Sequence, residues 1–154
     1  MPAYTPYDPA EEKRFFHEGI DLFNEGEFFE AHEAWEEIWK NTAGRKARFY
    51  QGLIQAAVVL EHMNRSNPRG VQRVWSTMLT KFDGLPEVFM GVNIPAFLSA
   101  LHPVVNHVLK METVTGQKPY DVELKWNRDA VPKVQLLYDP FETGEAGRLD
   151  SASI

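Results

Sequence analysis

The chain has 154 residues, a formal net charge of −6 and an isoelectric point near 5.4. This length predicts a single domain with a sizeable core, and the negative charge argues against nucleic acid or an anionic membrane as a partner. The chain contains no cysteine, which excludes disulfides and thiolate metal sites and is typical of a reducing compartment.

Residues 1–8 are rich in proline and tyrosine, and we expect them to form an extended lead-in. They have neither the basic region nor the apolar region of a signal peptide. No apolar run in the chain approaches the roughly 18 residues that a membrane-spanning helix needs. We therefore expect a cytoplasmic protein without a membrane partner.

Helical spacing of apolar residues predicts four consecutive helices in the first half of the chain. The first begins at Asp8-Pro9, a capping acid followed by a proline suited to the first turn, and ends before Gly26. The second spans about residues 27–41. The third, about 45–64, is apolar almost all round and is therefore expected in the middle of a bundle. The fourth begins at Asn67-Pro68 and runs to about residue 82.

The second half is less regular. Residues 83–94 form a connection, and Pro95 begins a fifth helical segment in which Pro103 predicts a kink or a split. We assign residues 9–118 to the helical domain, 119–141 to an extended arm that packs on it, and 142–154 to a flexible tail. Because short loops make successive helices antiparallel, the fold class is all-α, a single-domain bundle of about five helices.

The candidate site lies on the second helix. At about 100° per residue, His32 and Glu36 fall within an arc of aromatic residues that includes Trp35 and Trp39, while the other glutamates lie on the opposite face. Burying a carboxylate is costly unless it is paired, hydrogen-bonded or bound to a metal. The position of this pair therefore indicates a functional or structural polar site.

A matching polar stripe runs along the third helix. Its members fall within about 60° of one another on the helical wheel and are Arg48, Gln51, Gln55 and His62. We expect this stripe to face the second helix and to enclose, with His32 and Glu36, a mostly dry pocket walled by Trp35 and Trp39. The neighbouring cluster of Arg45, Lys46 and Arg48 is expected to neutralise the acidic helix that precedes it.

The pair has the residue types and spacing of a metal site. A histidine and a glutamate four residues apart on a helix can both reach one divalent ion. His62 would add a third ligand, and Gln55 would orient water or substrate. Such a site can polarise a carbonyl group or activate water, so a divalent metal is the candidate cofactor and hydrolysis the candidate reaction. No catalytic residue is assigned.

Other interpretations stay open. Glu36 has Lys40 one helical turn away, and Arg48 or His32 would also satisfy it within a structural network. The chain would then be a non-catalytic interaction module that offers an aromatic groove to a small molecule, peptide or partner protein. Nothing in the pattern favours a monomer over a homodimer.

These motifs together resemble the DUF309 family, small bacterial and archaeal helical proteins of unknown function. The resemblance covers about residues 12–82 and rests on the pattern Phe-x-x-Gly-x-x-Leu-Phe-Asn-x-Gly at 16–26, on segments 30–39 and 49–57, and on His62 and Asn67. The family motif His-x-x-x-Glu-x-x-Trp or Tyr is met by His32, Glu36 and Trp39. The resemblance implies metal binding at this motif and carries no assigned activity.

Overall fold

The computed structural model describes residues 8–112 and 123–152, so residues 1–7 of the expected lead-in, the end of the expected helical domain and the start of the arm lie outside it. The described residues form six α-helices, one short 3-10 helix (Arg128–Ala130) and a two-stranded antiparallel sheet, β1 (Val88–Phe89) and β2 (Val92–Asn93). The helices are α1 (Pro9–Asn24), α2 (Phe28–Trp39), α3 (Gly44–Asn64), α4 (Pro68–Phe82), α5 (Ile94–Leu109) and α6 (Glu145–Ala152). The predicted all-α bundle is thus confirmed.

Helix starts follow from local capping. The side chain of Asp8 accepts hydrogen bonds from the backbone N–H groups of Ala10 at 3.0 Å and Glu11 at 3.3 Å. Asn67 caps α4 by accepting the N–H of Gly70 at 3.2 Å. Both caps are followed by a proline in the first turn, and together these residues satisfy amide groups that have no partner within the helix.

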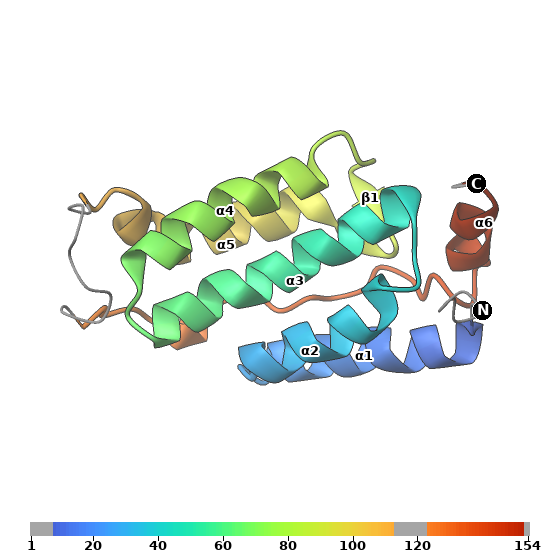
Figure 1. The fold of residues 1–154 in the computed structure, drawn as a ribbon, viewed down its shortest axis with the longest axis horizontal. Coiled ribbons are helices and arrows are strands. Elements are labelled where there is room, and N and C mark those ends of the chain that lie inside the picture. Colours follow the sequence, from blue (N-terminus) through green and yellow to red (C-terminus); the bar gives the residue numbers. More distant parts are fainter. Residues whose placement is uncertain (1–7, 113–122, 153–154) are drawn as a thin grey trace, which may run out of the picture.

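Helix α3 is the centre of the bundle. It lies between α2 and α4, with α1 behind α2 and α5 behind α4 (Figure 1). Phe49, Tyr50 and Leu53 on α3 are all buried. None of the described helices combines the length and the hydropathy required to cross a bilayer.

Helix α5 is continuous, although Pro103 lies inside it. The proline lacks one backbone N–H donor and therefore removes one helical hydrogen bond. Around it, Leu101, Val104 and Val105 are buried against the bundle, and this packing favours a single helix over the split that the sequence suggests.

The C-terminal part departs further from expectation. Residues expected to form a flexible tail instead form α6, which packs against α3 through the buried side chains of Ala146 and Leu149. These two residues are three positions apart and therefore share one helix face. The sequence of this segment does not predict the helix, because only two of its described side chains, the apolar Ala146 and Leu149, form its buried face.

The described portion of the arm lies along the bundle in an extended conformation. The side chain of Asn24 pairs with the backbone of Val134 in both directions, accepting its N–H at 2.8 Å and donating to its carbonyl at 3.0 Å. Further on, the N–H of Leu137 donates to the carbonyl of Gly91 at 2.8 Å. Gly91 has φ +80°, and a Cβ atom there would lie 2.4 Å from the carbonyl of Tyr138, so this close approach requires glycine.

Candidate functional site

Helix α2 is rotated relative to the predicted aromatic arc. Its buried face is formed by Phe28, Ala31, Ala34, Trp35 and Ile38. The side chains of His32 and Glu36 are 17% and 53% exposed, and Trp39 is 36% exposed. The centre of the buried face lies near Ala31, about 100° from His32 on the wheel. His32 and Glu36 therefore occupy the rim of the helix and not its core side.

The orientation of the His32 ring is set by the backbone. Its Nδ1 donates a hydrogen bond to the carbonyl of Phe29, because a carbonyl oxygen can only accept. In the neutral ring, Nε2 is then the nitrogen with the free lone pair. Nε2 lies 3.8 Å from Oε1 of Glu36, and the ring packs edge-on against Phe29 with the centroids 4.9 Å apart. Two acceptor atoms thus face each other at the surface.

Trp35 is a core residue. It is 0% exposed, and its Nε1 donates to the backbone carbonyl of Phe16 at 3.2 Å. The indole fills the space above Gly19, where a Cβ atom would lie 2.2 Å from Nε1. Trp35 and Trp39 therefore have different roles, although they lie one helical turn apart.

The polar stripe of α3 is half-buried, and both of its ends contact α4 or the loops that flank it. At one end, Arg48 donates to the carbonyl of Asp83 just after α4. At the other end, Nδ1 of His62 accepts a hydrogen bond from the amide of Asn67 at 3.2 Å. A contact between Arg48 and Glu36, one of the alternatives left open, is not among the described contacts. The two ends of the stripe thus join α3 to the residues that flank α4.

His62 belongs to the cap of α4. Burial lowers its pKa below 6.5, and the positive charges of Arg73 and Arg65 lower it further against the opposing effect of Glu61. The ring is therefore held neutral, which leaves Nδ1 available as an acceptor. Across the described ranges, no three His, Asp or Glu side chains come together in a way that could hold a metal ion, so His62 does not join His32 and Glu36.

The remaining members of the stripe are Gln51 and Gln55. Both are half-buried. The Oε1 atom of Gln55 is buried and has no hydrogen-bond partner among the described residues. A buried acceptor without a partner is uncommon in proteins, so Gln55 retains a buried polar atom that the described residues do not satisfy.

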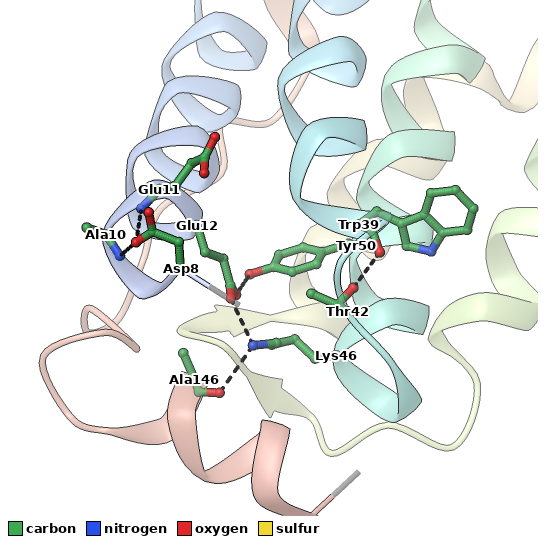
Figure 2. A network of polar contacts seen from close by, with 9 residues as sticks. All are labelled: Asp8, Ala10, Glu11, Glu12, Trp39, Thr42, Lys46, Tyr50 and Ala146. Carbon is green, nitrogen blue, oxygen red and sulfur yellow. Dashed lines mark hydrogen bonds and ion pairs between the residues drawn. The ribbon is translucent and has the colours of Figure 1, made fainter. Parts of the chain in front are cut away.

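A second polar cluster, which the sequence analysis missed, lies where α1, α3 and α6 meet. Lys46, expected to help neutralise the acidic helix before it, is 0% exposed, and Glu12 is 3% exposed. Nζ of Lys46 donates to Oε1 of Glu12 at 3.0 Å and to the carbonyl of Ala146 at 3.3 Å. The hydroxyl of Tyr50 donates to Oε2 of Glu12 at 2.5 Å. Figure 2 shows these groups converging from the three helices.

The sequence contains a signal for this cluster. On the helical wheel, Lys46 lies about 180° from Gln55 and therefore in the middle of the apolar side of its helix. A lysine at that position must either be buried with a partner or extend out of the core. Its distance of 34 residues from Glu12 explains why local spacing alone did not connect the two.

Comparison with known proteins finds a match to one family model in the first half of the chain. A family model described as a domain of unknown function, DUF309, matches residues 16–74. An uncharacterized protein of Aquifex aeolicus (strain VF5) is 31% identical over 121 residues, which cover 77% of this chain and 33% of that protein. The uncharacterized protein YpuF of Bacillus subtilis (strain 168) is 39% identical over 54 residues, which cover 34% of this chain and 31% of that protein. The matched regions thus span about a third of either relative.

Proposed function

We propose, on the premise that residues 16–74 of this chain form a DUF309 domain, that this domain binds a divalent metal ion through His32 and Glu36. The observation that carries the proposal is the arrangement of the two acceptors. Nε2 of His32 faces Oε1 of Glu36 at 3.8 Å, a separation shorter than two metal–ligand bonds of about 2.1 Å placed end to end. Small rotations of the half-exposed glutamate bring both atoms to one ion.

The hydrogen bond at the other ring nitrogen supports this proposal. Metal-binding histidines usually donate their second N–H to a carbonyl or carboxylate, which fixes the tautomer and the direction of the free lone pair. The contact from Nδ1 of His32 to the carbonyl of Phe29 has this form. The aromatic ring of Phe29 limits the motion of the imidazole further.

Two protein ligands leave coordination positions open. An ion held by His32 and Glu36 supplies Lewis acidity to a bound carbonyl or phosphoryl group, and hydrolysis is the reaction class that this chemistry favours. The exposure of Glu36 gives a substrate access to that position. The residues themselves hold the ion and orient its open side toward solvent.

The test is metal content and metal-dependent thermal shift with Mn²⁺, Fe²⁺, Ni²⁺ and Zn²⁺. We expect binding to the wild type and at least a tenfold weaker affinity in His32→Ala and in Glu36→Gln. Glu33→Gln is the matched control, because Glu33 is exposed on the same helix outside the pair. The proposal fails if none of the four ions binds the wild type, or if both site variants bind as tightly as the control.

A second candidate function is recognition of a peptide, favoured by the exposed aromatic side chains of Phe29 and Trp39 beside the pair. Exposed aromatic groups are typical of binding surfaces. Selection from a displayed peptide library, with Trp39→Ser as the counter-selection target, tests it. Peptides that bind only the wild type support recognition, and metal affinity unchanged in Trp39→Ser separates the two functions.

A further inference from the structure

Helix α6 lies over a charged cluster that the proposed metal site does not use. Glu12 and Lys46 beneath it are almost completely buried, and the Ala146 carbonyl of α6 accepts a hydrogen bond from Lys46 (Figure 2). Burying an ion pair usually costs as much in lost hydration as the attraction returns. A buried charged pair is therefore an inefficient way to stabilise the packing of α6 if the pair has no other role.

The described attachment of α6 includes two hydrogen bonds to one of its side chains. The carboxylate of Glu145 accepts the backbone N–H of Met90 at 2.9 Å and the hydroxyl of Tyr138 at 2.5 Å. The helix spans 8 residues, and isolated helices shorter than about 12 residues are only marginally stable in water. Contacts with the bundle must therefore keep α6 folded, so losing them releases the whole element.

A pivot lies immediately before the helix. Gly144 has φ +84° and is exposed, a conformation that glycine adopts readily and that allows a change of direction. Upstream of this pivot, the side chain of Asp139 is held by His17 at 3.0 Å and by the N–H of Phe141 at 2.9 Å. The chain is thus fixed up to the turn. Two hydrogen bonds cross the turn and would break on opening, from the N–H of Ala146 to the carbonyl of Pro140 at 3.0 Å and from the Arg148 side chain to the carbonyl of Thr143 at 3.1 Å.

We propose that α6 is a hinged cover over the Glu12–Lys46–Tyr50 cluster, which opens about Gly144 while the helical bundle stays folded. Opening returns the ammonium and the carboxylate to water, and hydration of these two charges offsets part of the contacts that are lost. In the open state the Lys46 ammonium loses the Ala146 carbonyl and becomes accessible to reagents in solution.

The experiment measures acylation of the Lys46 amine in the full chain under native conditions, using an amine-reactive acetyl ester and peptide mass spectrometry. Glu145→Gln weakens the attachment, and we expect Lys46 to react at least fivefold faster than in the wild type. Glu142→Gln is the matched control, because that carboxylate lies on the same segment but is 73% exposed. Exposed Lys40 serves as the internal reference in every sample.

A variant that stabilises α6 should slow the reaction of Lys46, and a folding defect would not produce that result. Gly147 lies within α6, and a Cβ atom there meets nothing within 4 Å. Gly147→Ala raises helix propensity, so we expect Lys46 to react about fourfold more slowly. Hydrogen exchange of α6 faster than that of α3 supports a local opening. The proposal is overturned if Lys46 reacts only at the rate of global unfolding, or if Glu145→Gln and Glu142→Gln give equal rates.

Discussion

Replacing Lys46 with methionine tests whether the buried ion pair is energetically coupled. The substitution keeps most of the side-chain volume but removes the ammonium that lies 3.0 Å from Glu12. The carboxylate then remains buried at 3% exposure with Tyr50 as its described donor. Removing one partner of a buried pair costs roughly 3–5 kcal/mol, a large part of the roughly 5–15 kcal/mol by which a domain of this kind is stable.

Removing the second charge should restore most of this loss. In Glu12→Gln/Lys46→Met no charge is left without a partner, and the amide of glutamine can still accept the hydroxyl of Tyr50. We expect the double variant to be more stable than Lys46→Met, with a coupling energy of at least about 2 kcal/mol. The control is Lys40→Met, because Lys40 pairs with Glu37 at 2.9 Å on the surface and such pairs are worth about 1 kcal/mol or less.

Urea denaturation followed by far-UV circular dichroism gives the free energy of unfolding for the wild type, both single variants, the double variant and the control. Effects of Glu12→Gln and Lys46→Met that simply add, with a coupling energy below about 0.5 kcal/mol, would show that the two charges do not interact. A loss in Lys40→Met as large as that in Lys46→Met would show that burial does not decide the cost.

Two further predictions concern packing and pH. Gly19→Ala places a Cβ atom 2.2 Å from Nε1 of Trp35, so we expect it to destabilise the protein by about 1–3 kcal/mol despite its better helix propensity, whereas Gly147→Ala should stabilise it slightly in the same urea titration. The pKa of His62 is below 6.5 in the folded state, so its contribution to stability is complete above pH 6.5 and is lost as pH falls through the folded pKa. Through His62 alone, the free energy of unfolding changes with pH by at most about 1.4 kcal/mol per pH unit. In urea titrations repeated at several pH values, His62→Gln should remove this part of the pH dependence of the unfolding free energy. A pH dependence equal to that of the wild type would contradict the lowered pKa of His62.

The fold could be predicted from the sequence where the signals are local. Asp8 and Asn67 accept backbone N–H groups of the next turn, and each is followed by a proline, so both helix starts are encoded within a few residues. The apolar composition of α3 correctly predicts its central position. These features depend on neighbours three or four residues apart and do not need knowledge of the tertiary structure.

The site could be predicted only in part, because residue type does not distinguish core from rim. Trp35 and Trp39 lie one turn apart and look equivalent on the wheel, yet one is buried and the other is exposed. An arc drawn through both tryptophans has its centre closer to His32 and Glu36 than the buried face of α2 does. The pair itself was correctly singled out as neighbours, since their 3.8 Å contact is a property of a single helix.

Long-range features could not be derived from spacing. Helix α6 depends on contacts such as Lys46 with Ala146, which are separated by 100 residues. Its own sequence offers a short, weakly apolar face. Only the packed bundle supplies the surface on which those residues become helical, and the same holds for the partnership of Glu12 and Lys46.

The side chain of Asn24 fixes the position of the arm along the bundle. Both of its described hydrogen bonds join the backbone of Val134, as pairing with a neighbouring strand would, while the Val134 side chain is buried in the core. The next fixed point, where Leu137 donates to Gly91, is three residues away. The number of residues between these two points is therefore fixed: deleting one residue there would release the arm from one end or the other.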